Sequence, residues 1–223
     1  MGELVWLGVA LFAYSLALWI YQRAQHNALL HPIVVSALLI LALIYGLDAS
    51  LKSVVDDIQL LHWLLGPTTV ALAIPIYRQT QLVKQLGMGL LLPIVVGGMV
   101  APLSAWIILY CLDSSIALQL TILTKSITTP LAMDTARLIG GIPPVAAIVV
   151  IMTGIVGVVF SQWIFKLAHI EEDAVKGLTL GIFAHGIGTA KAIQISERAG
   201  AFASLALGVN GVLTAIILSL VLQ

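Results

Sequence analysis

Three short clusters of hydroxyl, glycine and basic residues contain most of the side chains that could do chemistry in this apolar chain. The most polar cluster is Lys125-Ser126-Ile127-Thr128-Thr129-Pro130. The other two are Gly66-Pro67-Thr68-Thr69 and His185-Gly186-Ile187-Gly188-Thr189-Ala190-Lys191. Ammonium and hydroxyl groups can donate hydrogen bonds to a negatively charged oxygen. The clusters are therefore suited to bind a small anion such as a carboxylate.

Each cluster stands inside a segment that is apolar enough to cross a bilayer. An unpaired backbone group in the bilayer costs several kcal/mol, so a helix breaks there only where protein or water satisfies the freed groups. Secondary transporters use such breaks, because the N-terminal end of a half-helix carries partial positive charge and attracts anions. We predict non-helical backbone near mid-depth at all three clusters, converging on one cavity. Close helix packing by small residues is the alternative explanation.

The ionisable side chains of the clusters each allow a functional and a structural interpretation. Lys125 attracts the anion, or it extends to the membrane interface from a helix that begins later. His185 takes up a coupling proton near neutral pH, or it is a buried neutral histidine bonded to a carbonyl. Lys191 is a second anion partner, or the first cytoplasmic charge after its segment. Hydroxyl groups in such helices also commonly bond back to the preceding turn.

The predicted substrate-binding residues come from all three clusters. They are Thr68, Thr69, Lys125, Ser126, Thr128, Thr129, Pro130, His185, Gly186, Gly188, Thr189 and Lys191. Outside the clusters, Asp134 and Arg137 have the spacing of a local helical ion pair, and we expect them to mark a helix end. Asn210 is expected to form an interhelical hydrogen bond. A proton or a sodium ion is the expected coupling ion, and no cofactor or metal site is predicted.

The composition identifies the class of protein. The 223 residues are 61% hydrophobic and 9% charged, against roughly 45–50% and about 25% in soluble domains. The net charge is zero, which gives no reason to expect a nucleic-acid partner. The single cysteine, Cys111, excludes an internal disulfide. Motifs typical of nucleotide-binding loops, zinc hydrolases or nucleophilic serines are missing, so we expect no enzymatic activity.

The expected fold is an all-α, polytopic transmembrane helical bundle formed by one integral membrane domain over residues 1–223. A spanning helix takes about 20 residues, and that length divides the chain into eight segments. They are residues 4–21, 32–47, 60–77, 86–112, 116–139, 143–167, 174–195 and 202–222. Residues 50–59 are expected at the interface. The first segment lacks a signal-peptide pattern and is expected to remain as a span.

Orientation is predicted from the distribution of Lys and Arg, which are enriched in cytoplasmic loops. With eight spans and an outside N-terminus, all four arginines lie on the cytoplasmic side: Arg23, Arg78, Arg137 and Arg198. Both termini are then extracytoplasmic, and Asp56 and Glu172 face outside. In the alternative, residues 116–139 are two half-helices that enter and leave on one side, which restores an inverted repeat and removes the arginine asymmetry.

Five stretches, in order, resemble those of the LrgB/CidB/YohK membrane-protein family. Three carry the clusters, at residues 65–73, 125–133 and 184–192; the Gly-Gly-x-Pro at 140–143 and the Gly-Ala-x-x-Ser-Leu-Ala run at 200–206 add to them. The resemblance extends over nearly all of the chain after Pro32. It implies a multi-pass protein of the plasma membrane and a homo-oligomer, with a small LrgA/CidA-type membrane protein as a partner.

The resemblance implies two different functions. One is holin- or antiholin-like regulation of murein hydrolase export and cell lysis. The other is transport of small monocarboxylates such as glycolate, glycerate, pyruvate or lactate, because the plastid glycolate/glycerate transporter is similar to a fusion of the two components. Polar breaks in three segments, with lysines near two of them, suit an enclosed anion site with alternating access. We therefore favour the transporter.

Overall fold

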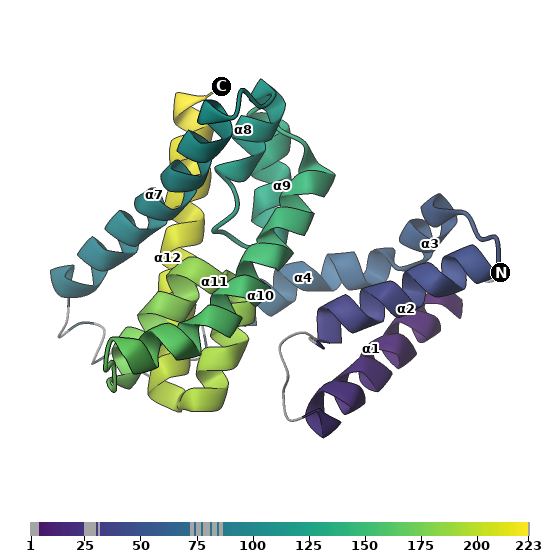
Figure 1. Ribbon diagram of the computed structural model, residues 1–223, viewed down its shortest axis with the longest axis horizontal. Helices are drawn as coiled ribbons and strands as arrows, with labels where there is room; N and C mark the ends of the chain where they lie inside the picture. Colours follow the sequence, from purple (N-terminus) through teal and green to yellow (C-terminus); the bar gives the residue numbers. More distant parts are fainter. Residues whose placement is uncertain are drawn as a thin grey trace. The chain divides into compact units, whose positions relative to one another are not determined.

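The computed structural model describes residues 5–24, 30, 32–71, 74, 77, 81, 84 and 87–222. Every regular element among them is a helix, which confirms the predicted all-α fold. The chain divides into two compact units, Met1–Ala71 and Leu72–Gln223, which are described separately (Figure 1). The single membrane domain over residues 1–223 stays a prediction.

The described part of the first unit has four helices: α1 (Val5–Arg23), α2 (Pro32–Gly46), α3 (Leu51–Asp57) and α4 (Gln59–Ala71). The bounds of α1 and α2 closely follow the two predicted segments. Trp6, Ile44 and Val54 form a small buried cluster that joins α1, α2 and α3. The stretch expected at the interface, residues 50–59, thus contains the short helix α3, and Val54 packs this helix against α1 and α2.

Helix α4 contradicts one predicted break. Pro67 lies inside it, and the helix continues from Gln59 to Ala71. The prediction of non-helical backbone at residues 66–69 is therefore wrong. A proline removes one backbone hydrogen bond, and membrane helices tolerate this when neighbouring groups satisfy the freed carbonyl. The side chains of Thr68 and Thr69, two predicted site residues, lie outside the described residues.

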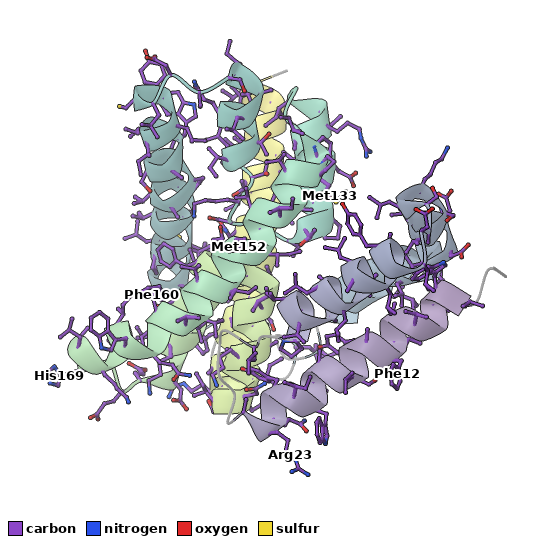
Figure 2. All side chains as sticks on the ribbon, turned by 45° about the vertical axis from the view of Figure 1, so that its right-hand side comes forward. Phe12, Arg23, Met133, Met152, Phe160 and His169 are labelled. Carbon is purple, nitrogen blue, oxygen red and sulfur yellow. The ribbon has the colours of Figure 1, made fainter. Side chains whose placement is uncertain are left out.

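Among the residues that the structure describes, the second unit has three long helices and two broken segments. The long helices are α7 (Met88–Cys111), α10 (Pro143–Leu167) and α12 (Glu197–Val221). With α1, these are the four described helices that are long and apolar enough to cross a membrane, so the predicted count of eight is not confirmed. Large apolar side chains such as Met152 and Phe160 project from α10 (Figure 2) and are about half exposed. Such a surface suits a lipid environment.

The first broken segment is α8 (Ile116–Ile122), a non-helical stretch and α9 (Thr129–Leu138). Just after α9, the amide of Ile142 donates a hydrogen bond of 2.8 Å to Thr121 Oγ1 in α8. A side chain at Gly141 would lie 2.9 Å from the same oxygen, so glycine permits the close approach. The segment therefore enters and leaves at one end. The prediction of a plain fifth span is wrong, and the re-entrant alternative is correct.

The second broken segment, α11 (Asp173–Ile195), also reverses direction. His185 has φ 39° and ψ −124°, which interrupts the helix. Beyond it, a Cβ at Gly188 would overlap the carbonyl of Leu180, eight residues earlier, so the returning half packs against the entering half. Arg198 and Glu172 form an ion pair of 3.0 Å, which brings together the residues that flank α11. The predicted seventh span is thus a second re-entrant hairpin.

The two hairpins open at opposite ends of this unit. Helix α10 begins a few residues after the last residue of the first hairpin and ends a few residues before the first residue of the second. Its 25 residues give a length of about 37 Å at 1.5 Å per residue. Figure 1 shows α10 running between these two ends. The arrangement is an inverted pair, each member a long helix followed by a hairpin.

The hairpins correct the predicted orientation. Arg137 lies at the end of α9, where the first hairpin opens. Arg198 lies at the start of α12, where the second hairpin opens, and its partner Glu172 is at the same end. The prediction that all four arginines share one side is therefore wrong. The prediction that Glu172 and Arg198 lie on opposite sides is wrong as well. Arg78 lies outside the described residues.

Candidate functional site

The tips of the two hairpins meet midway along the long helices. His185, in the second tip, lies beside Lys125 in the first tip. Asn210, midway along α12, donates a hydrogen bond of 2.8 Å to the carbonyl of Ser126. A Cβ at Gly154, midway along α10, would lie 2.9 Å from the His185 ring. Two of the three predicted clusters thus converge.

The first tip presents a cation and the N-terminus of a helix. Lys125 is half-buried, and its ammonium group donates to Ser126 Oγ at 3.3 Å. Thr128 precedes α9 in an extended conformation, and Pro130 stands in the first turn, where a missing N–H has no cost. The first N–H groups of α9 have no partner within the helix and carry partial positive charge.

Unpartnered polar atoms mark both tips. Thr128 Oγ1 is buried without a hydrogen-bond partner, and so is Nε2 of His185, whose side chain is 2% exposed. A buried polar group without a partner costs roughly 1–3 kcal/mol. A bound molecule that pairs with these atoms would remove that cost. The helical half that follows His185 begins at Gly186, so a second helix N-terminus lies at the same depth.

The electrostatics of the tips favour an anion. Lys125 and the two half-helix N-termini contribute positive charge. Within residues 123–128 and 184–189, which form the tips, the sequence contains no Asp or Glu to neutralise it. Ser126 and His185 are almost fully buried, so the tips are closed on each other in this conformation. Each hairpin opens toward a different end of this unit.

Other predicted residues do not join this site. Lys191 lies on the returning half of α11, in a pocket at its open end. Thr189 Oγ1 donates to the carbonyl of His185 at 2.8 Å, which matches the back-bonding interpretation. Asp134 and Arg137 are exposed and form the predicted local pair at 3.4 Å, near the end of α9. Gly188 serves the hairpin turn. Thr129 and Pro130, by contrast, lie at the site, in the first turn of α9.

The sequence reasoning missed the role of Gly154, and it predicted an interhelical hydrogen bond for Asn210 without naming its partner. Gly154 admits the His185 ring against α10, because any side chain there would fill its place. A glycine in an apolar helix gives no signal that separates this role from ordinary packing. Asn210 forms the predicted interhelical bond, but its partner is the backbone of the first tip. The position of this polar side chain, midway along an apolar helix, was the signal in the sequence that it bonds a buried polar group.

Two opposed re-entrant hairpins whose polar tips meet midway along the long helices define a helical membrane protein with a buried polar centre. The LrgB-like family matches residues 10–223, and the chain belongs to this family. No solved structure matches the chain.

Three relatives illustrate the family. The protein YwbG of Bacillus subtilis is 30% identical over 95% of this chain and 93% of its own length. A Haemophilus influenzae protein is 30% identical over 94% of this chain and 90% of its own length. An antiholin-like protein LrgB of Bacillus cereus is 26% identical over 94% of this chain and 91% of its own length. The similarity therefore covers both units of the fold.

Proposed function

We propose that this protein is a secondary transporter of small monocarboxylates, such as glycolate, glycerate, pyruvate or lactate, and not an enzyme. The observation that carries the proposal is the meeting of two oppositely oriented hairpin tips around Lys125 and His185. Broken helices whose half-helix ends face a midplane site are the recurring device for binding solutes in such transporters.

In this proposal the Lys125 ammonium group pairs with the substrate carboxylate. The N–H groups at the start of α9 and the hydroxyl groups of Thr128 and Thr129 donate further hydrogen bonds. His185 Nε2 faces the remaining polar part of the substrate, or exchanges a coupling proton. Sodium is the alternative coupling ion. Movement of the first hairpin opens the site to one side, and movement of the second opens it to the other.

We place the protein in the plasma membrane as a multi-pass protein. The end at which the second hairpin opens carries Lys166, Lys176, Lys191 and Arg198. The end at which the first hairpin opens carries Arg137. By the positive-inside rule, the second hairpin then opens to the cytoplasm and the C-terminus is extracytoplasmic.

Uptake by liposomes tests the proposal. Purified protein is reconstituted, and entry of labelled glycolate, glycerate, pyruvate and lactate is followed with and without a proton or sodium gradient. We expect saturable uptake of at least one acid, competition by the unlabelled acids and acceleration by one gradient. Absence of saturable uptake of all four acids would contradict the proposal.

A second candidate function is antiholin-like regulation of cell lysis, favoured by the relatives that are named antiholin-like protein LrgB. In that case the chain acts in an assembly of its own copies, with a small LrgA/CidA-type membrane partner. This candidate predicts leakage that does not saturate with substrate, shows no competition among acids and is unaffected by changes at Lys125. The liposome experiment therefore separates the two functions.

A further inference from the structure

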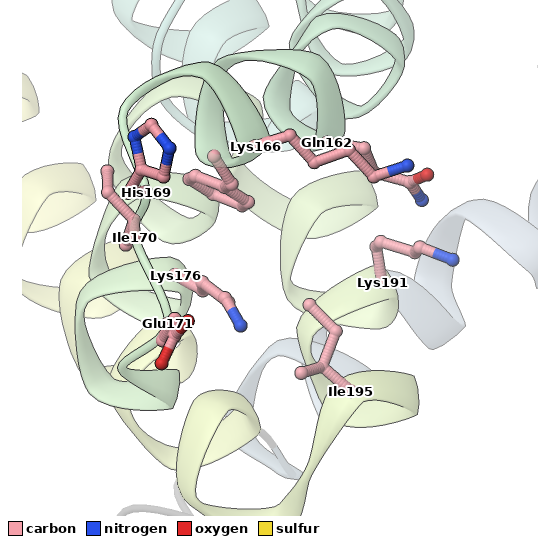
Figure 3. Close-up of a pocket in the computed structure, with 9 residues that line it drawn as sticks. Gln162, Lys166, His169, Ile170, Glu171, Lys176, Lys191 and Ile195 are labelled. Carbon is pink, nitrogen blue, oxygen red and sulfur yellow. The ribbon is translucent and has the colours of Figure 1, made fainter.

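A second basic site lies at the open end of the α11 hairpin. An open pocket of about 460 Å³ is lined there by the end of α10, the turn that follows it and both halves of α11 (Figure 3). Its lining includes Phe165, Lys166, Glu171, Lys176, Lys191 and Ile195. The proposed substrate site lies at the opposite end of this hairpin, at its tip near His185.

Three lysines approach this pocket from three different stretches of chain. Lys166 belongs to the last turn of α10, Lys176 to the entering half of α11 and Lys191 to its returning half. Figure 3 shows them on three sides of the opening. Hydrophobic packing does not require three like charges around one space, and their mutual repulsion is relieved when an anion binds between them.

The acidic groups nearby leave the pocket positively charged. Glu171 is the acidic residue of its lining. Asp173 lies 3.9 Å from the Lys176 ammonium group, and Glu172 is paired with Arg198 instead. Within the described part of the chain, Lys166 and Lys191 form no ion pair. Both are therefore available to a ligand.

The surface beside the pocket suits the boundary between lipid and water. Trp163, one turn before the end of α10, is 68% exposed. Tryptophan is enriched at the headgroup level of membrane proteins. The apolar lining residue Ile195 is also exposed at 37%. The three lysines thus stand where lipid headgroups lie.

We propose that this pocket binds a phosphate group at the membrane interface, as presented by the headgroup of an anionic phospholipid. A phosphate accepts hydrogen bonds from several ammonium groups at once, and basic pockets between spanning helices bind such headgroups. The bound phosphate would join α10 to both halves of α11 and hold the open end of the hairpin together. This site is independent of the proposed transport function.

Lipid titration of the purified full-length protein tests the proposal. Phosphatidylglycerol or phosphatidylcholine is added in detergent, and bound lipid and Tm are followed by native mass spectrometry and thermal unfolding. The variant Lys166→Gln/Lys191→Gln is compared with Lys52→Gln/Lys84→Gln, which removes the same charge elsewhere. Inorganic phosphate and glycerol 1-phosphate, tested without lipid, distinguish a soluble phosphate from a lipid headgroup.

We expect phosphatidylglycerol, and not phosphatidylcholine, to bind and to raise Tm in the native protein and in the control variant. In the pocket variant the half-saturating concentration should rise about tenfold or more, which is about 1.4 kcal/mol per tenfold. Each single variant, Lys166→Gln and Lys191→Gln, should show a smaller rise, which keeps the test open if the double variant does not fold. An equal response to soluble phosphate assigns the site to a free ligand. An unchanged response in every lysine variant would overturn the proposal.

Discussion

Thr128 is the residue at which a substrate hydrogen bond can be tested most cleanly, because its buried hydroxyl has no protein partner. We predict that Thr128→Val weakens apparent substrate affinity. A hydrogen bond to a charged partner contributes roughly 1.5–3 kcal/mol, equivalent to about a tenfold to hundredfold rise in KM. Thr179→Val is the matched control, since Thr179 Oγ1 is already bonded to the carbonyl of Val175. Equal KM values for the two variants would remove Thr128 from the site.

Asn210 has a structural role that can be separated from binding. Its amide satisfies the buried carbonyl of Ser126 in the first tip. Asn210→Leu leaves that carbonyl unpaired, which costs roughly 1–3 kcal/mol. We predict a lower Tm in detergent, measured by thermal unfolding. Thr179→Val, which removes only a hydroxyl bonded back to the carbonyl of Val175, should have little effect. A Tm unchanged in Asn210→Leu would show that the bond does not hold the tip.

At the scale of the element, two glycines of one hairpin make opposite predictions. A Cβ at Gly188 would overlap the carbonyl of Leu180, whereas a Cβ at Gly186 meets nothing within 4 Å. Gly188→Ala should therefore separate the two halves of α11 and lower Tm, and Gly186→Ala should leave Tm nearly unchanged. If both variants unfold at the same temperature as the native protein, α11 does not fold back as described.

The sequence predicted the lengths of the apolar segments well, because hydrocarbon thickness sets them. Helix α10 has the predicted bounds, and α12 begins five residues before the predicted start, where the hydroxyl of Ser196 caps it. The reversal within α11 was not predicted. It depends on a positive φ at His185, which is uncommon for any residue other than glycine. The neighbouring residues are equally compatible with a straight helix. An apolar segment of this length therefore does not reveal whether it crosses or returns.

The candidate site was predictable only in part, for the same reason. The clusters at residues 125–130 and 185–191 were identified from polar residues in apolar surroundings, and their tips do meet. The contribution of Lys191 was misplaced, because a returning helix carries it back to the open end. Proline gave the wrong signal in α4, where the helix continues through Pro67. Polar residues and proline in an apolar segment indicate candidate breaks. Tertiary contacts decide which of these candidates are real and which of them come together.

At the scale of the whole molecule, the inverted hairpins make a prediction about topology. Cysteine substitutions at Glu172 and Arg198 should be labelled from the same side of the membrane, and one at Arg137 from the opposite side. The exposed native Cys111 is first replaced by serine. With the second hairpin opening to the cytoplasm, a membrane-impermeant reagent added outside intact cells should react only at residue 137. Labelling of residue 172 but not 198 from outside would restore the plain eight-span topology.

The central claim is that Lys125, at the meeting point of the hairpin tips, binds the carboxylate that the protein transports. Uptake by Lys125→Met tests it most directly, because methionine keeps much of the bulk and removes the charge. Lys52→Met, which changes an exposed lysine of α3, is the matched control. We predict that the protein carrying Lys125→Met remains folded in liposomes and loses saturable carboxylate uptake, while the control retains it. Saturable uptake with unchanged KM and maximal rate in Lys125→Met would contradict the claim.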